Sequence, residues 1–251
     1  MYAGAAPGTH IRYLVDLFPG FKFVLVDPAP FTVKEDQCIE IRQQLFTDEM
    51  CEEFNSDKYQ EYDEKTDHYH SKVLFISDIR SADPQVLSNE QVEKCVAEDM
   101  SRQKKWVKSI RPRGSMLKFR LSWKPGKTVY LSGDVYLPIW GPITTSESRL
   151  IVSEDIKEKE YDNTEYEDQM FFFNTHYRVG RFIHNVEGEG IDHCFDCASE
   201  VSVLKNYLLS PFNTQPTNDI WKEISKMSYS ISRKISGDRT CLLYTSPSPR
   251  D

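Results

Sequence analysis

The residues nearest the N-terminus have the types and spacing to hold a nucleoside cofactor. Gly4 and Gly8 bracket a short loop that follows residues 1–3, and a helical pattern begins after it. Glycine lets a backbone turn tightly and approach a ligand closely. Asp27 ends the next apolar stretch, about twenty residues further on, where a carboxylate can accept hydrogen bonds from both hydroxyls of a ribose. The spacing therefore predicts a nucleotide-binding strand, loop and helix.

The loop by itself leaves two kinds of cofactor open. Dinucleotide enzymes use the same plan, with a third glycine at the start of the helix and an open turn onto the pyrophosphate. Here Pro7 lies within the loop, and His10 and Ile11 stand where a third glycine would be expected. These departures favour S-adenosylmethionine, and a dinucleotide-dependent oxidoreductase stays the alternative.

A run of basic residues offers a second kind of chemistry, the binding of phosphates. From Arg102 to Lys127 the chain has ten Lys or Arg residues and no Asp or Glu, although its net charge is −8. We call this segment the basic stripe. Because local potential matters more than net charge, the basic stripe favours RNA binding, and a solvated helix face is the alternative.

Cysteine chemistry is a third possibility. His193, Cys194 and Cys197 lie close together and include one C-x-x-C pair. No second ligand pair follows at the spacing of a zinc site. The six cysteines form no framework, so we interpret them as reduced cytosolic thiols and predict no metal site.

Regular elements must position these residues, and the hydrophobic periodicity predicts them. We expect helices over residues 11–18, 48–54, 85–110, 165–177 and 200–209. We expect strands over residues 22–27, 38–42, 73–77, 116–121 and 149–152, and a hairpin over 128–140 around Gly133 and Asp134. The polar, Tyr-rich residues 55–70 are interpreted as a surface insertion. Since strands alternate with helices through residue 121, the fold class is α/β, with a mainly parallel central sheet flanked by helices.

Composition and the two ends bound the class of protein. With 39% hydrophobic and 28% charged residues, the chain should be globular. No apolar run has the length of a membrane span and no signal peptide is visible, so we expect a cytoplasmic protein that binds no membrane.

Residues 1–3 can supply only the end of the strand that a glycine loop needs, so we expect preceding sequence to be missing. Residues 241–251 resemble the translated read-through of a sequencing adapter and are interpreted as a non-native tail.

Residues 5–14, A-A-P-G-T-H-I-R-Y-L, closely resemble the cofactor loop of the poxvirus cap-specific mRNA 2′-O-methyltransferases, an FtsJ-like family whose members double as regulatory subunits of poly(A) polymerase. Further similar blocks follow in the family's order: residues 74–81 (L-F-I-S-D-I-R-S), 115–120 (S-M-L-K-F-R), 130–142, 146–150 (S-E-S-R-L) and 166–174. The resemblance covers most of residues 1–210. It implies a Rossmann-like, S-adenosylmethionine-dependent methyltransferase, which we expect to be a single domain over residues 1–240.

The resemblance also implies which residues carry the chemistry. A ribose hydroxyl is a poor nucleophile, and a nearby lysine can take its proton or stabilise the developing alkoxide. FtsJ-type enzymes use a Lys-Asp-Lys-Glu set, and the match carries its last three members onto Asp78, Lys118 and Glu147. The first lysine would lie before Met1, so the chain as given is expected to be weak or inactive.

Binding residues are implied in the same way. The residues carried over for the cofactor are Tyr2, Gly4, Gly8, Asp27 and Arg80, with Phe46 as a neighbour of the adenine. The family has a basic residue where this chain has Ala29, which puts that contact in doubt.

For RNA, Trp123 matches a position of the family whose aromatic ring stacks on the methylated guanine of a cap. A positively charged base is attracted to the face of an aromatic ring. Glu167 matches a carboxylate that accepts hydrogen bonds from the guanine edge. Pro125 stands where the family has a second acid. Arg120 is a further candidate RNA contact, resting on the basic stripe alone.

Two further hypotheses stand beside the oxidoreductase. The first is S-adenosylmethionine-dependent 2′-O-methylation of capped mRNA, in a host cytoplasm or virion if the protein is viral. The second is a non-catalytic RNA-binding subunit that gives a poly(A) polymerase its processivity. The expected partners are capped mRNA and a catalytic polymerase subunit, and no DNA is expected. The basic stripe fits both hypotheses.

Overall fold

The computed structural model describes residues 1–235 apart from 84, 189 and 216. The tail proposed over residues 241–251 lies outside the described residues. Backbone contacts divide the chain into two compact units. Unit 1 comprises Met1–Leu137 and Glu147–Tyr166, and unit 2 comprises Pro138–Ser146 and the chain from Glu167 onward. The single domain over residues 1–240 stays a prediction, and each unit is described by itself.

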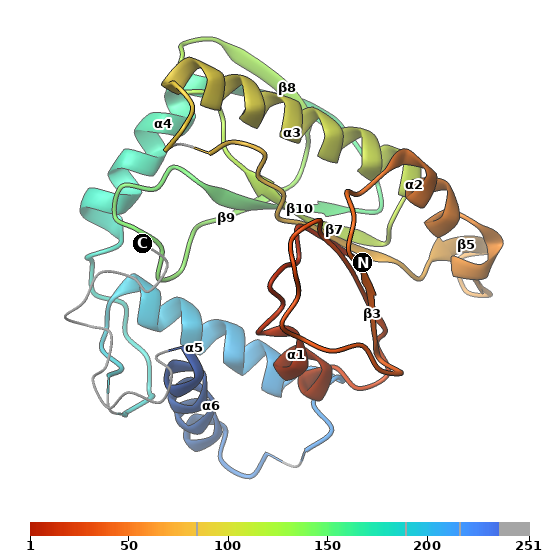
Figure 1. Cartoon of the computed structure of the whole chain (residues 1–251). Coiled ribbons are helices and arrows are strands. Elements are labelled where there is room, and N and C mark those ends of the chain that lie inside the picture. Colours follow the sequence, from red (N-terminus) through yellow and green to blue (C-terminus); the bar gives the residue numbers. More distant parts are fainter. Residues whose placement is uncertain (84, 189, 216, 236–251) are drawn as a thin grey trace. The chain divides into compact units, whose positions relative to one another are not determined.

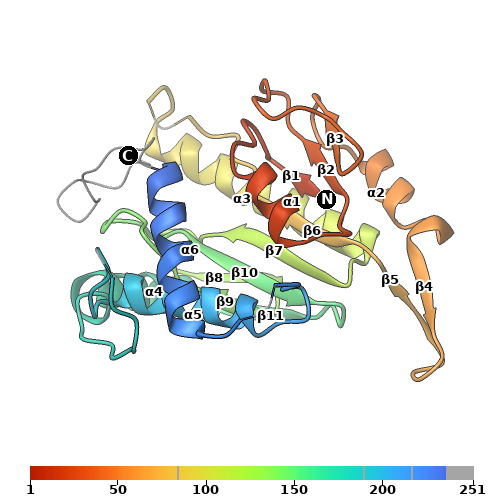
Figure 2. The same cartoon turned by 90° about the horizontal axis from the view of Figure 1, so that it is seen from below.

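Unit 1 is built on a seven-stranded sheet with the strand order β3-β2-β1-β6-β7-β10-β9 (Figure 1, Figure 2). Neighbouring strands from β3 to β7 pair in parallel, and β10 and β9 extend the sheet in antiparallel pairing. The mainly parallel central sheet of an α/β fold is therefore confirmed. Its strands are β1 (Tyr2–Ala3), β2 (Phe23–Val26), β3 (Ile39–Arg42), β6 (Leu74–Ser77), β7 (Gly114–Phe119), β9 (Asp134–Tyr136) and β10 (Ser148–Ser153).

Helix α1 (Ile11–Leu17) covers one face of this sheet. Its Ile11 is fully buried in a cluster with Leu25 and Ile39. Burial of one such side chain contributes roughly 1.5–3 kcal/mol. Residues opposite one another in adjacent strands point to the same side, so Tyr2 and its partner Ile76 share the face of α1.

Helices α2 (Asp48–Phe54) and α3 (Asn89–Ile110) belong to the other face. Phe75 alternates to that side, where Phe46 lies between it and Trp106 of α3, with ring centroids 5.7 Å and 4.6 Å apart. Helix α3 begins four residues later than predicted because Ser88 and Gln91 form a capping box, which fixes Asn89 as the first helical residue.

The surface insertion contains a small hairpin of its own. After a short 3₁₀ turn (Asp57–Tyr59), β4 (Gln60–Asp63) pairs antiparallel with β5 (His68–Ser71). Figure 2 shows this hairpin projecting from the central sheet. Most of its side chains are exposed, so its strands carry no apolar alternation that a sequence pattern could detect.

The hairpin predicted over residues 128–140 is wrong. Strand β8 (Lys127–Leu131) pairs with β11 (Glu158–Asp162) in a separate two-stranded sheet, whereas β9 pairs with β10. Gly133 does not close a turn but crosses between the two sheets. A Cβ at Gly133 would lie 2.2 Å from the carbonyl oxygen of Ile151, so the missing side chain allows the close approach of these backbones.

An aromatic cluster fastens the small sheet to the central one. The fully buried ring of Phe119 in β7 has centroids 5.7 Å from Tyr130 of β8 and 5.2 Å from Tyr161 of β11. Tyr166 approaches the same ring edge-on at 5.5 Å. Strand β11 escaped the sequence analysis because four of its five residues are exposed and only Tyr161 faces the core.

Unit 2 contains mainly helices. Helix α4 (Asn163–Phe172) crosses the unit boundary and continues as a π-helical turn (Phe173–Tyr177). Helices α5 (Phe195–Leu208) and α6 (Ile220–Ile235) lie side by side (Figure 1) and bury Val201, Leu204 and Ile224 between them. Helix α6 was not predicted from the sequence, and α5 begins five residues before the helix predicted over residues 200–209.

The described helices are short or rich in polar residues. Among the residues that the structure describes, no helix combines the length and the apolar character that crossing a bilayer requires. The cytoplasmic location stays a prediction.

Candidate active site

The glycine loop lies at the carboxyl end of β1, against the end of β6. Gly4 has φ +78°, and a Cβ there would lie 2.7 Å from the carbonyl carbon of Asp78. Only glycine combines this left-handed backbone with that close approach. The contact brings the loop beside Asp78, which follows β6 directly.

Asp27 fastens the same loop to the end of β2. Its Oδ2 accepts a hydrogen bond from the backbone amide of Ala6 at 3.1 Å, and its Oδ1 accepts one from Ala29 at 2.8 Å. An ionised carboxylate has about four acceptor sites, so both oxygens can still accept from ribose hydroxyls. Asp27 therefore orders the loop and keeps the capacity predicted for it.

Strand register brings Lys118 to Asp78. Ser77 of β6 lies opposite Leu117 of β7. The next residue of each strand, Asp78 after Ser77 and Lys118 after Leu117, therefore lies beside the other. Lys118 Nζ is 3.1 Å from Asp78 Oδ1 and 3.7 Å from Glu147 Oε1. Gln103 of α3 donates to the Lys118 carbonyl at 3.0 Å and so anchors this point of the strand from the other face. The three residues carried over by resemblance therefore converge.

Two arginines complete a charged cluster, which we define as Asp78, Arg80, Lys118, Glu147 and Arg149. Arg149 lies opposite Lys118 in the antiparallel pair of β7 and β10. It donates to Asp78 Oδ1 at 2.8 Å and to Glu147 Oε1 at 2.9 Å, and Arg80 pairs with Glu147 Oε2. Arg149 was not predicted from the sequence. Its signal was its place two residues after Glu147, which puts it in the strand that pairs with β7.

The positive charges around Glu147 oppose the effect of burial on the pKa of its carboxyl. Burial alone would raise the pKa of the Glu147 carboxyl, but the positive charges of Lys118, Arg149 and Arg80 outweigh it and hold that pKa below its ordinary value. The carboxyl is therefore ionised at neutral pH and available as a hydrogen-bond acceptor for Lys118.

We expect the Arg149→Met substitution to destabilise the protein more at neutral pH than in acid. A carboxyl with a depressed pKa contributes stability above its unfolded pKa, and this contribution is lost as pH falls through its folded pKa. Removing Arg149 raises the pKa of Glu147, so that contribution shrinks at neutral pH. Urea unfolding of both proteins from neutral pH to below about pH 4 checks this, and a stability gap that does not narrow on acidification would count against it.

The remaining cofactor candidates lie near the loop or in the core. Tyr2 packs on the cluster of Ile11 and Leu25, with its ring 5.9 Å from His10. Phe46 packs between Phe75 and Trp106, as described above. Their cofactor contacts, like those of Gly8 and Arg80, stay predictions.

The RNA candidates are divided between the two units. Trp123 is 49% exposed in unit 1, so its ring is accessible for stacking. Arg120 is mostly buried and pairs with Glu93, which leaves its guanidinium less available to RNA than the sequence suggested. Glu167 is exposed in unit 2.

The basic stripe is largely neutralised by acids from other segments. Eight of its ten cations have a carboxylate within 4.0 Å: Arg102, Lys104, Lys105, Lys108, Lys118, Arg120, Lys124 and Lys127. Arg111 and Arg113 are exposed and form no ion pair with any described residue. The sequence pattern therefore overstated the free positive charge of this surface.

The chain matches one family model over nearly all of its described length. The model described as "Poly A polymerase regulatory subunit" matches residues 1–235.

Curated viral proteins are similar over shorter stretches. The cap-specific mRNA (nucleoside-2′-O-)-methyltransferase of Myxoma virus (strain Lausanne) is 28% identical over 188 residues, which cover 69% of this chain and 52% of that protein. The protein of the same name from Fowlpox virus (strain NVSL) is 26% identical over 191 residues, covering 71% and 58%. The chain thus spans about half the length of the curated relatives it matches.

Among solved structures, bluetongue virus VP4, described as a multifunctional RNA-capping production line, aligns with a TM-score of 0.45 and 11% identity. The alignment covers 68% of this chain and 28% of that one. At that TM-score the likeness carries no argument about function.

Proposed function

Because the chain belongs to the family of poly A polymerase regulatory subunits, we propose that it transfers the methyl group of S-adenosylmethionine to the ribose 2′-O of capped mRNA. The observation that carries this proposal is the convergence of Lys118 with Asp78 and Glu147 beside the glycine loop. The names of the Myxoma and Fowlpox virus relatives support the same reaction.

The residues at the carboxyl ends of β1, β2 and β6 fit S-adenosylmethionine. The backbone of the loop from Gly4 to Gly8 would approach the cofactor, and Asp27 would accept from its ribose hydroxyls. The bound cofactor supplies an electrophilic methyl group on a sulfonium. Ligands of α/β proteins bind at this edge of the sheet, where the loop and the charged cluster meet.

Lys118 is the residue we assign to the 2′-hydroxyl. Its amine takes the proton of the hydroxyl or, as the ammonium, stabilises the developing alkoxide. Asp78 and Glu147 hold Nζ in place from two sides. Arg149 bonds the same two oxygens, Asp78 Oδ1 and Glu147 Oε1, so it fixes both carboxylates whether or not Lys118 engages the substrate.

A non-catalytic RNA-binding subunit of a poly(A) polymerase is the second candidate. The description of the family favours it, and a catalytic polymerase subunit would then be the partner. The basic stripe gives this candidate limited support, because ion pairs occupy most of its cations.

A thermal-shift comparison tests the cofactor first. A ligand that binds only the native state raises the melting temperature, so S-adenosylmethionine should raise it and NAD should not. A shift with NAD alone would sink the methyltransferase and favour an oxidoreductase. Filter binding of RNA, run on the same protein beside an assay of methyl transfer, separates the tethering subunit, because only that candidate would bind RNA without transferring a methyl group.

We expect Trp123→Ala to weaken the binding of capped RNA by about 5-fold to 150-fold, because a stacked base contributes roughly 1–3 kcal/mol. Uncapped RNA of the same sequence should lose much less, since only the cap carries the cationic guanine. The ring is 49% exposed, so its loss should cost little stability. Fluorescence anisotropy with both RNAs measures the two affinities, and an equal loss for both would refute the stacking role.

A further inference from the structure

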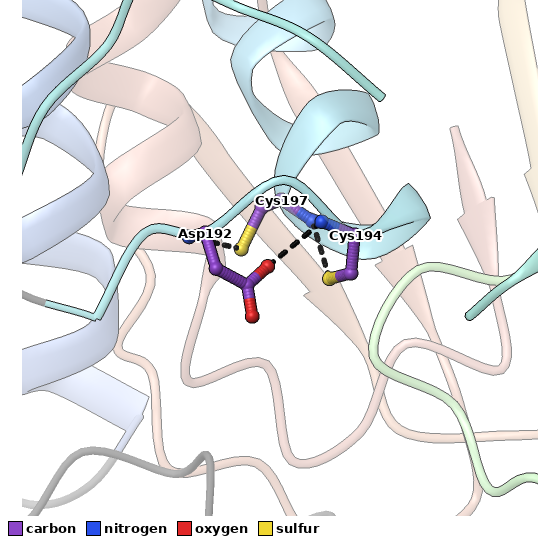
Figure 3. Close-up of side chains that lie close together, drawn as sticks. All are labelled: Asp192, Cys194 and Cys197. Atoms are coloured by element: carbon purple, nitrogen blue, oxygen red, sulfur yellow. Dashed lines mark hydrogen bonds between the residues drawn. The ribbon is translucent and has the colours of Figure 1, made fainter. Parts of the chain in front are cut away.

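We propose that Asp192, Cys194 and Cys197 of unit 2 form a binding site for a zinc ion. One ligand atom from each residue lies within 4.8 Å of the other two. Figure 3 shows the carboxylate and the two sulfurs turned toward one another.

The spacing of these atoms suits a tetrahedral ion after a small adjustment. Ligand atoms around Zn²⁺ lie roughly 3.5–4 Å apart, given Zn–S and Zn–O distances of about 2.3 Å and 2.1 Å. Closing the cluster from within 4.8 Å therefore needs shifts of about 1 Å or less, within the reach of side-chain torsions. Three protein ligands leave a fourth position for water, on the side where Asp192 is exposed.

The backbone holds the two sulfurs at a fixed spacing. Cys194 is the N-cap of α5 and Cys197 lies in its first turn, so the helix sets their separation. Helix α5 is in turn packed on α6 through Val201 and Leu204. A rigid element of this kind positions ligands more precisely than a loop does.

Backbone amides donate hydrogen bonds to the three proposed ligand side chains, as groups around the ligands of a metal site do. The amide of Asp192 donates to Cys197 Sγ at 3.2 Å, and the amide of Cys197 donates to Cys194 Sγ at 3.5 Å. The Asp192 carboxylate accepts from the Cys194 amide at 2.8 Å through Oδ1, and it also accepts from the thiols of Cys194 and Cys197, whose protons a bound ion would replace. Such bonds orient ligands and offset the negative charge of bound thiolates.

The donor set selects the ion. Thiolates are soft ligands that favour Zn²⁺ over Mg²⁺ or Ca²⁺, both of which prefer oxygen. His193 is not a fourth ligand through Nδ1, because that atom faces the carbonyl of Phe182 at 3.2 Å. The sequence predicts no metal site because no second C-x-x-C pair follows Cys197, whereas the third ligand proposed here is a carboxylate two residues before the first cysteine.

The test is titration of the reduced, chelator-treated full chain with Co²⁺ alone, followed by Zn²⁺. One equivalent of Co²⁺ should produce thiolate-to-cobalt charge-transfer absorption and the intense visible bands of a tetrahedral site, and Zn²⁺ should displace it. Cys194→Ser should abolish the charge-transfer signal, and Cys95→Ser, which alters a thiol of α3, should leave it unchanged.

If the cysteine variants fold poorly, Asp192→Asn still tests the site. Asp192 is exposed, so this substitution should leave the fold intact. We expect it to weaken Zn²⁺ binding by about tenfold or more, with an unchanged far-ultraviolet circular dichroism spectrum. Unchanged affinity in Asp192→Asn would overturn the three-ligand site. The proposal would also be overturned if the reduced wild-type chain bound no metal. Oxidation of the two thiols to a disulfide in air, without metal binding in the reduced chain, would count as the same result.

Discussion

Lys118→Met will lower the rate of methyl transfer by about 10²–10⁴-fold, the usual contribution of a positioned acid or base, while the protein stays folded. Lys118 is the residue whose amine lies between Asp78 and Glu147 at the edge of the sheet. Methionine keeps most of the length of the side chain and removes its charge and its titratable proton. The two carboxylates do not become unpaired, because Arg149 still bonds both of them.

The matched control is Lys124→Met. Lys124 is a lysine of the same basic stripe, mostly exposed and 3.5 Å from Glu90. Its loss removes the same charge without touching the charged cluster, so transfer should stay near the wild-type rate. Single-turnover rates with labelled S-adenosylmethionine and capped RNA, on protein expressed in its full reading frame, compare the two. Equal losses in both variants would show that Lys118 acts only through the overall charge.

Gly4→Ala should destabilise unit 1 by roughly 2–5 kcal/mol and weaken cofactor binding with it. Two penalties add at this position. A non-glycine residue at φ +78° costs about 1–2 kcal/mol, and the new Cβ would lie 2.7 Å from the Asp78 carbonyl carbon and 2.8 Å from the Ile79 nitrogen. These are backbone atoms of the segment that directly follows β6, so the loop must move away from the sheet.

Gly20→Ala separates the two penalties. Gly20 has φ +92°, and a Cβ added there would meet no atom within 4 Å, so alanine at this position carries only the conformational cost. Urea unfolding should therefore show about 1–2 kcal/mol for Gly20→Ala and a clearly larger loss for Gly4→Ala. Similar losses would mean that the loop of Gly4 does not press on Asp78. If the two variants differ as expected, calorimetric titration with S-adenosylmethionine should show weaker binding for Gly4→Ala and unchanged binding for Gly20→Ala.

The parallel half of the fold could be predicted because its strands carry apolar residues, in continuous runs in β2 and β6 and alternating with charged residues in β3. Strands β2, β3 and β6 begin and end within a residue or two of the predicted ranges, and α2 has the predicted limits. In the antiparallel half, the strand over residues 149–152 was predicted within a residue of β10, but the pairing of the strands could not be predicted, because it depends on contacts between residues far apart in the chain. Gly133 looked like a hairpin turn from sequence, and only the approach of Ile151 shows that it joins two sheets.

The candidate site was predicted largely through the family resemblance, which the match over residues 1–235 confirms. Lone residues such as Asp78 or Glu147 carry no local signal that separates a site from a surface charge. Arg149 was missed because its role depends on register with Lys118, which sequence alone does not give. The basic stripe misled for a related reason, since acids distant in sequence, such as Glu158, pair with its lysines.

The most direct test of the central claim is the identity of the methylated atom. The protein, expressed in its full reading frame, is incubated with S-adenosylmethionine and capped RNA, and the product is digested to nucleosides for mass spectrometry. We predict a 2′-O-methylated ribose that is absent from the Lys118→Met reaction. Binding of cofactor and RNA without any methylated ribose would contradict the account and leave the tethering subunit as the better description.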